Sequence, residues 1–500
     1  AYRQLGMAEE ADTYYNEAVA IASNILGDEH PETLQIYALM GELYTAAGAS
    51  DDAQGINDFV VATLTSSLGD AHQSTIETRV NLVAALKAVG AYGEARSLLT
   101  EICDVVEASY GIWHPQTFSC LTQMAALESS TANFDESADL YDTIIARMTE
   151  SLPSINAAAL NILSQLAEVY REQGDYRQAK DLLSGVIFTA AQIGEIETSF
   201  TAKSYLGRVL NNEGDLTGAQ SVTEEVLDYG LANWADRPLD IYNTLLELGV
   251  IYQRQGKLAQ AESTYREALN GLTMLVGEMH PSTLVALNNL GQVYEETGMY
   301  DLAEPMLKKA LGNFELSLGI ENPQSSRARN NLALLFESQG NFREAEPLYI
   351  RSIEILSDVR GDDYTDTIAV RNNLAFLYMM MEDYDRSAGM FARVLEQWSV
   401  LFGEDHQFTL KAMNNLGRIN HKLGNLEEAE QFVLGSLELR RSTLGEQHVD
   451  VIRSMIDLGS IYIDQDRLSE SDAMLTDALA LAEKMLGNQH PYTFEALNSL

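Results

Sequence analysis

Apolar residues recur along the chain at the three- and four-residue spacing of amphipathic helices. Within residues 281–319, one apolar run ends at Gly298 and a second run continues to Gly319. Glycine favours the left-handed backbone conformation that ends a helix, so each glycine marks a helix boundary. The pattern therefore predicts a unit of two antiparallel helices. The first run contains Leu284, Leu287, Leu290, Val293 and Tyr294, and the second contains Ala303, Leu307, Ala310 and Leu311.

This unit repeats every 42 residues along the chain. One step, from Gly174 to Gly214, is 40 residues and predicts a two-residue deletion in a helix-to-helix connection between them. A fixed period of this length is typical of repeat arrays. We therefore expect residues 1–500 to form one continuous array of about twelve units, truncated at both ends. The turn positions within the units are Gly6, Gly48, Gly90, Ala132, Gly174, Gly214, Gly256, Gly298, Gly340, Glu382, Gly424 and Asp466.

Small residues on both sides of the turn predict close packing of the paired helices. Seven residues before the turn, six units carry glycine, although glycine inside a helix costs about 1 kcal/mol relative to alanine. Five residues after the turn, every unit carries Ala or Ser. Pro305 and Pro347 are expected in the first turn of their second helices, where a missing N–H disrupts little. The six glycines are Gly41, Gly207, Gly249, Gly291, Gly417 and Gly459.

The arrangement of small residue, tyrosine, turn and second small residue resembles the tetratricopeptide repeat. The 42-residue length and the motifs G-x-x-H-P, N-N-L-[GA] and A-E-P-[LM] are similar to the subtype found in kinesin light chains. This resemblance implies an all-α fold, a right-handed superhelical solenoid of antiparallel helix pairs, that binds protein partners. We expect regular units at 1–110 and 240–500 and irregular units at 111–240, where the linkers become SLPS, IGEI and ADRP.

The charge balance argues against nucleic acid as a partner. The chain carries 74 acids and 32 bases, a net charge of -42, whereas binding a polyanion requires neutralised phosphates. Its longest uncharged run, residues 151–167, is shorter than the roughly 20 apolar residues that span a bilayer, so we expect no membrane insertion. Cys103 and Cys120 are too few for a disulfide framework. We expect them to be small buried residues in a cytoplasmic protein.

Candidate metal and catalytic residues are sparse. Seven of the eight histidines occupy the same linker slot, about one helix pair apart, which is too far to share a metal ion. We interpret the linker glycine as the end of one unit and His-Pro as the start of the next unit's first helix. No catalytic or phosphate-binding motif is present, so we expect no cofactor, no metal site and no enzymatic activity. The seven are His30, His72, His114, His280, His406, His448 and His490.

Paired asparagines recur in four successive units, beginning with Asn288 and Asn289. At 100° per residue, the second Asn of each pair falls opposite the apolar stripe of the first helix. The resemblance implies that this face lines a concave groove in which Asn bonds an extended peptide. From residue 327 to 422 the same face carries four bases and no acid. The candidate peptide-binding residues are Asn289, Arg327, Asn331, Leu334, Asn373, Phe376, Met380, Lys411, Asn415, Arg418 and Lys422.

Two interpretations of this face stay open. Asn can bond peptide backbone, Arg and Lys can bond carboxylates, and Leu334, Phe376 and Met380 can seat an apolar side chain. The groove at 327–422 would then take a peptide with acidic residues around an aromatic or aliphatic anchor. Alternatively, the Asn pairs link adjacent helices and the bases balance an acidic scaffold.

Three functions fit a repeat array of this kind. The first is a kinesin-light-chain-like adaptor, a scaffold that recognises peptide segments through its concave face. The second is the C-terminal sensor array of a larger signalling ATPase of the NB-ARC type, in which such repeats follow a nucleotide-binding domain. The third is self-assembly.

Overall fold

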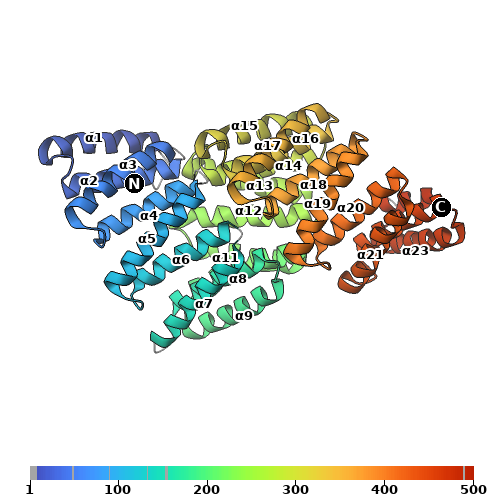
Figure 1. The fold of residues 1–500 in the computed structure, drawn as a ribbon, viewed down its shortest axis with the longest axis horizontal. Coiled ribbons are helices and arrows are strands. Elements are labelled where there is room, and N and C mark those ends of the chain that lie inside the picture. Colours follow the sequence, from blue (N-terminus) through green and yellow to red (C-terminus); the bar gives the residue numbers. More distant parts are fainter. Residues whose placement is uncertain (1–7, 48–49, 89–90, 132, 152–155, 488–489) are drawn as a thin grey trace. The chain divides into compact units, whose positions relative to one another are not determined.

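A computed structural model of the protein describes residues 8–47, 50–88, 91–131, 133–151, 156–487 and 490–500. These residues form 24 helices and no strand. Figure 1 shows the helices as coiled ribbons. The prediction of an all-α helical repeat solenoid is confirmed, whereas the hand of the superhelix stays a prediction. The helices are α1 (Ala8–Leu26), α2 (Pro31–Ala47), α3 (Ser50–Leu68), α4 (Gln73–Ala88), α5 (Tyr92–Tyr110), α6 (Pro115–Ser130), α7 (Phe134–Ser151), α8 (Ala157–Glu172), α9 (Tyr176–Ile193), α10 (Ile196–Glu213), α11 (Leu216–Asn233), α12 (Pro238–Arg254), α13 (Leu258–Val276), α14 (Pro281–Glu296), α15 (Tyr300–Leu318), α16 (Pro323–Ser338), α17 (Phe342–Arg360), α18 (Thr365–Met380), α19 (Tyr384–Phe402), α20 (Gln407–Leu423), α21 (Leu426–Leu444), α22 (Val449–Asp464), α23 (Leu468–Leu486) and α24 (Pro491–Ser499).

The chain forms two compact units. The first comprises residues 1–339 with 358–361, and the second comprises residues 340–357 with 362–500. Within each unit, helices that follow one another in sequence pack together, such as α14 with α15 in the first unit and α20 with α21 in the second. The expectation of one continuous array stays a prediction.

The turn inside each repeat has the left-handed backbone that the glycines predict. Gly256 and Gly298 have φ of 72° and 73°, and Gly340 has φ of 75°. Where the sequence replaces glycine, Glu382 and Asp466 keep the same conformation with φ of 61° and 60°. The turn geometry therefore persists without glycine. Gly6, Gly48, Gly90 and Ala132 lie outside the described residues.

The connections between repeats use a second glycine conformation and a histidine cap. Gly277 ends α13 with φ 87° and ψ 168°, a region that residues with a Cβ rarely occupy. His280 then caps α14, because its Nδ1 accepts a hydrogen bond from the backbone N–H of Ser282 at 3.2 Å. The other six linker histidines accept from the residue two positions later in the same way. The interpretation of the histidines as helix starts is confirmed.

The two-residue deletion lies between α9 and α10. Residues 194 and 195 connect these helices, whereas four residues, 277–280, connect α13 and α14. Gly194 ends α9 in the left-handed conformation, with φ 80° and ψ 13°. The prediction of a shortened helix-to-helix connection is confirmed.

Close packing explains the glycines inside the first helices. A Cβ added at Gly249 would lie 2.4 Å from the ring of Tyr265, and one at Gly459 would lie 2.6 Å from Leu475. The second small position is also buried, because Ala303 and Ala345 expose none of their surface. The serine at this position in a later repeat, Ser387, donates a hydrogen bond to the carbonyl of Ala375 on the facing helix at 2.8 Å.

The tyrosines before the turn connect neighbouring repeats. The hydroxyl of Tyr294 donates to Glu262 at 3.1 Å, and that of Tyr378 donates to Glu346 at 3.0 Å, in each case 32 residues earlier. Glu346 is the acid of an A-E-P motif, which this bond explains. An arginine completes one contact, since Arg386 lies over the ring of Tyr378 and bonds Glu346 at 3.0 Å.

The expected position of the helix prolines is wrong by one turn. Helices α15 and α17 begin directly after the repeat turn, at Tyr300 and Phe342. Pro305 and Pro347 are therefore the sixth residues of these helices and lie inside them. The helices begin earlier than expected because the left-handed turn leads into the next helix with only one residue between them.

Candidate functional site

The predicted peptide-binding residues lie on the first helices of their repeats, in two separate units. Asn289 lies on α14, and Arg327, Asn331 and Leu334 lie on α16, all in the first unit. Arg327 is exposed and the other three are half-buried. Asn288, the first member of its pair, is only 8% exposed. The second Asn of this pair is therefore the more accessible one, as the helical spacing predicts.

Asn289 borders a hollow of about 280 Å³ in the first unit. At its floor, the hydroxyl of buried Tyr265 donates to Gln253 at 3.2 Å, and Gln253 in turn donates to Glu296. Burial raises the pKa of both Tyr265 and Glu296 above their usual ranges. The hollow thus offers amide, hydroxyl and carboxyl groups at one place. Its lining residues are Val250, Gln253, Arg254, Tyr265, Asn289, Gln292 and Glu296.

Of these lining residues, only Asn289 was among the binding residues predicted from the sequence. Val250 and Arg254 on α12 lie 42 residues before Gln292 and Glu296, at the same positions of the preceding repeat. Extending the same helix positions to the preceding repeat would have identified Val250 and Arg254.

A charged cluster lies on the same helix face N-terminal to the hollow. Arg208 on α10 lies 3.2 Å from Glu168 on α8 and 3.7 Å from Glu247 on α12. Burial raises the pKa of Glu247 to about 6, opposed by Arg208 and reinforced by the charge of Glu168. Glu247 occupies the position that Asn289 takes one repeat later. This part of the face therefore offers acids where the later repeats offer amides.

In the second unit, α18 and α20 carry an apolar and basic face. Met380 is 55% exposed, and half-buried Phe376 packs edge-on against Phe391 with 5.1 Å between ring centroids. Lys411 and Lys422 on α20 are exposed. Asn373 and Asn415 are half-buried on the same helices. The unit thus places an apolar seat, amides and cations on its first helices.

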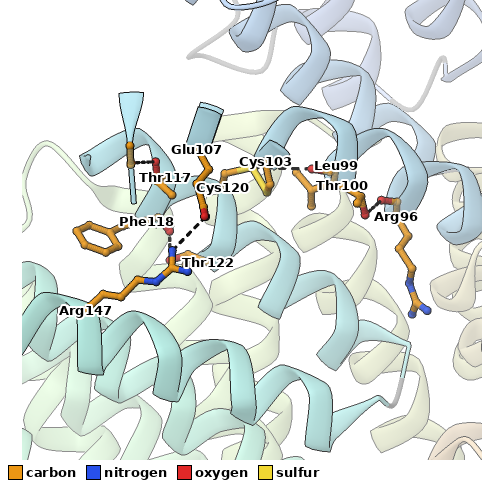
Figure 2. The surroundings of a disulfide bond; sticks show 11 residues. Arg96, Leu99, Thr100, Cys103, Glu107, Thr117, Phe118, Cys120, Thr122 and Arg147 are labelled. Carbon is orange, nitrogen blue, oxygen red and sulfur yellow. Dashed lines mark hydrogen bonds and ion pairs between the residues drawn. A yellow bond between two sulfur atoms is a disulfide. The ribbon is translucent and has the colours of Figure 1, made fainter. Parts of the chain in front are cut away.

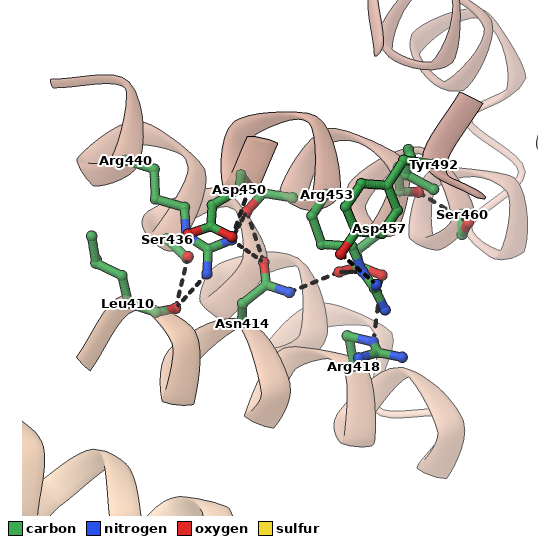
Figure 3. A network of polar contacts seen from close by, with 12 residues as sticks. Leu410, Asn414, Arg418, Ser436, Arg440, Asp450, Arg453, Asp457, Ser460 and Tyr492 are labelled. Atoms are coloured by element: carbon green, nitrogen blue, oxygen red, sulfur yellow. Dashed lines mark hydrogen bonds and ion pairs between the residues drawn. The ribbon is translucent and has the colours of Figure 1, made fainter. Parts of the chain in front are cut away.

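Arg418 contacts an acid of the next repeat, as Figure 3 shows. Its Nε lies 3.5 Å from the carboxylate of Asp457 on α22, so its charge is partly balanced within the protein. Asp464, on the same helix, lies 2.7 Å from the ring of His421. The acids of α22 therefore reach back to side chains on α20, and His421 is one of the residues that they contact.

The two members of an asparagine pair play different parts in this unit. Asn414 is 3% exposed; it donates to Asp457 at 2.7 Å and accepts from Ser454 at 2.8 Å. It therefore links α20 to α22, as the structural interpretation of the pairs expected. Its neighbour Asn415 is half-buried. In this repeat the linking role belongs to the first Asn.

Cys103 on α5 and Cys120 on α6 form a disulfide, shown in Figure 2. Cys120 is buried at 4% exposure, as expected, but the expectation of two unpaired thiols is wrong. The helices bring together two residues that are 17 apart in sequence. Disulfides are typical of oxidising compartments, so the cysteines no longer support the predicted cytoplasmic location.

The described residues contain neither a candidate metal centre nor a candidate membrane span. Within the described ranges, no group of three or more His, Cys, Asp or Glu side chains is placed to hold a metal ion. Across these same residues, every helix is too short or too polar to cross a bilayer.

Sequence comparison matches the tetratricopeptide repeat over residues 1–56 and through overlapping segments from 240 to 484. A second description of the same repeat matches residues 163–187. These matches cover more than half of the chain. The chain belongs to the tetratricopeptide repeat family. No curated protein matches at the threshold applied. The overlapping segments are 240–316, 300–358, 324–378, 366–434 and 421–484.

Comparison with solved structures finds several similar chains. A Rap protein complexed with competence and sporulation factor has a TM-score of 0.50 and 13% identity, covering 74% of this chain and 99% of its own. A putative kinesin light chain repeat protein of Podosopora anserina has a TM-score of 0.37 and 20% identity, covering 41% and 97%. BtubC (BKLC) from P. vanneervenii has a TM-score of 0.39 and 20% identity, covering 47% and 92%. The likeness to the Rap protein supports the helical repeat fold.

Proposed function

We propose that this tetratricopeptide array is an adaptor that binds extended peptide segments along the first helices of its repeats. The second unit is the principal site. The observation that supports this proposal most strongly is the face shared by α18 and α20. It carries exposed Met380 and two exposed lysines beside partly accessible asparagines. A peptide with acidic residues around an aromatic or aliphatic anchor matches these groups.

The contact of Arg418 with Asp457 bears on which residues would meet the peptide's acids. Because Asp457 already contacts Arg418, the exposed amines of Lys411 and Lys422 are the main cationic groups of this site. The anchor side chain would lie against Met380 and the edge of Phe376. Asn373 and Asn415 would bond the peptide backbone, since an amide can both donate and accept.

The hollow beside Asn289 is proposed as a separate subsite of the first unit. Its lining combines three amides with Arg254 and Glu296, whose opposite charges offset each other, and therefore suits a neutral polar side chain. An array that serves as the sensor of a larger signalling ATPase would bind its ligand through the same helices. The proposal therefore concerns a binding face that the adaptor and sensor roles share.

The test is a comparison of partners captured from cell extract by the wild-type chain and by two charge variants. The first variant combines Asn373→Ala, Lys411→Glu and Lys422→Glu. The control combines Arg351→Glu and Lys484→Glu, which make the same charge change on second helices of the same unit. Captured proteins are digested, and candidate acidic segments are resynthesised and titrated.

The proposal predicts that a resynthesised segment binds the wild type and the control variant with similar affinity. The Asn373, Lys411, Lys422 variant should lose about 1–3 kcal/mol of binding, a factor of roughly 5 to 150, while its circular dichroism spectrum stays helical. Equal binding by all three proteins would show that the first helices of this unit are not the site.

A further inference from the structure

A carboxylate of the protein itself lies between two arginines beside the proposed peptide site. Asp457 on α22 is 11% exposed at its side chain, and it lies 3.5 Å from Nε of Arg418 and 3.4 Å from Nε of Arg453. Figure 3 shows these three side chains pointing toward one another, with Tyr492 of α24 close to Arg453. Asp457 thus occupies the place where two guanidinium groups would otherwise meet an acid from outside.

These two ion pairs are weaker than the strongest pairs that an arginine can form with a carboxylate. The strongest pairs form two parallel bonds at about 2.7–2.9 Å, whereas each arginine here approaches Asp457 through Nε alone, at the longer distances given above. Arg453 also reaches the hydroxyl of Tyr492 at 3.4 Å. Both arginines therefore keep donor capacity toward a second acceptor.

Asp457 is nevertheless fixed in position. Asn414 donates to it at 2.7 Å, and Asn414 is buried with its own oxygen bonded to Ser454 at 2.8 Å. Arg440, also buried, donates to the same Ser454 at 2.6 Å. To swing away from the arginines, the carboxylate would have to break its bond with Asn414 and leave a buried amide unpaired, which is costly.

We propose that Asp457 is an internal competitor that limits how tightly this face binds acidic peptides. The inference rests on the proposed peptide-binding function and identifies a residue that controls its affinity and register. A peptide carboxylate that approaches Arg418 also meets the fixed negative charge of Asp457, which weakens its attraction to the arginine. Its acids are therefore directed toward Lys411 and Lys422, away from the end of the site at α22.

The test uses Asp457→Asn, which removes the charge and keeps an oxygen to accept from Asn414. Asp464→Asn is the matched control, because it makes the same charge change on the same helix at an exposed position that pairs with His421. Fluorescein-labelled peptides EEDLEDEE, SSNLSNSS and KKRLKRKK are titrated against each protein by anisotropy. Circular dichroism verifies the fold, and Asp457→Ser replaces the Asn variant if that variant does not fold.

The inference predicts that Asp457→Asn binds the acidic peptide about tenfold more tightly than the wild type, and that Asp464→Asn gains roughly twofold or less. Binding of the acidic peptide by the wild type with no gain in the Asp457 variant would overturn the inference and leave the proposed function standing. Equal gains in both variants would also overturn it, since net charge alone would then explain them. If no protein binds any of the three peptides, the proposed function falls and the inference falls with it.

Discussion

Single residues at the helix starts show how a histidine can serve structure rather than chemistry. The Nδ1 atom of His406 accepts from the backbone N–H of Phe408 at 3.3 Å, which requires an unprotonated nitrogen at that position. Asn322 fills the same slot in another repeat and accepts from Gln324 at 2.8 Å. The slot therefore needs an acceptor for the first turn of the helix, and His or Asn supplies it.

Protonation of His406 should destabilise the fold. Burial lowers the pKa of His406 to about 4, below its usual value of 6.5 in an unfolded chain. The unfolded chain therefore binds more protons between these values, so this stabilising contribution is full above pH 6.5 and is lost as the pH falls toward 4. His406→Asn should remove that pH dependence and keep the cap, whereas His406→Ala should cost about 1 kcal/mol at pH 7.

Chemical denaturation of the three proteins at pH 4.5 and pH 7.5 measures both effects. If the Asn variant keeps the full wild-type pH dependence, the titration belongs to other groups. If the Ala variant matches the wild type at pH 7.5, the cap contributes nothing.

Among the residues that the structure describes, two repeat turns keep a left-handed backbone at a residue with a Cβ. That conformation costs roughly 1 kcal/mol for most residues other than glycine. Glu382→Gly, at φ 61°, should therefore raise the free energy of unfolding by about 0.5–1 kcal/mol. Gly424→Ala, at the equivalent turn of the next repeat with φ 82°, should lower it by a similar amount. Denaturation curves measure the change in free energy of unfolding for each variant. A loss of stability in Glu382→Gly would contradict this explanation.

At the scale of the helix pair, close approach rather than flexibility explains the buried glycines. Gly249→Ala would place its methyl group 2.4 Å from Tyr265, and overpacking of this kind costs about 1–3 kcal/mol. Gly185 is the matched control, because it lies inside α9, is exposed and has nothing within 4 Å of an added Cβ. Gly185→Ala should stabilise the chain by about 0.5–1 kcal/mol. Thermal unfolding of both variants measures the two changes in stability. Changes of the same sign in the two variants would contradict the packing argument.

The disulfide connects the second helix of one repeat to the first helix of the next. Closing a loop of about this length stabilises a fold by roughly 3 kcal/mol. Reduction should therefore increase amide hydrogen exchange in α5 and α6 more than in α20 and α21. The control is the variant with Cys103→Ser and Cys120→Ser, whose exchange should not respond to the reductant. Unchanged exchange in the reduced wild type would show that packing alone holds this junction.

Features inside one repeat were predictable from the sequence, because they recur every 42 residues in successive repeats. The turn glycines, the facing small residues and the linker histidines all fall at fixed positions of the unit. Contacts between repeats were less visible, because they depend on which side chains reach across from one first helix to the next. Asn414 with Asp457 and His421 with Asp464 share a spacing of 43 residues, and a search at that spacing would have found both pairs. The pairing of Cys103 with Cys120 follows from helix placement that the sequence pattern does not specify.

At the scale of the molecule, the predicted binding residues divide between two compact units. Asn289, Arg327, Asn331 and Leu334 belong to the first, and the remaining candidates belong to the second. The second unit combines an apolar seat with exposed lysines, whereas the hollow of the first is lined by amides, one acid and one arginine. The two units therefore suit different peptide chemistry, although both use first helices.

The measurement that tests this account most directly is photo-crosslinking of a labelled acidic peptide to the second unit. A photoreactive amino acid replaces either Met380 on α18, which is 55% exposed, or Val400 on α19, which is 81% exposed. Both positions are apolar and accessible, but only Met380 lies on the proposed face. The account predicts that the labelled peptide EEDLEDEE crosslinks at position 380 and that unlabelled peptide suppresses this product. Crosslinking at position 400 with none at position 380 would contradict the proposal that the first helices form the binding face.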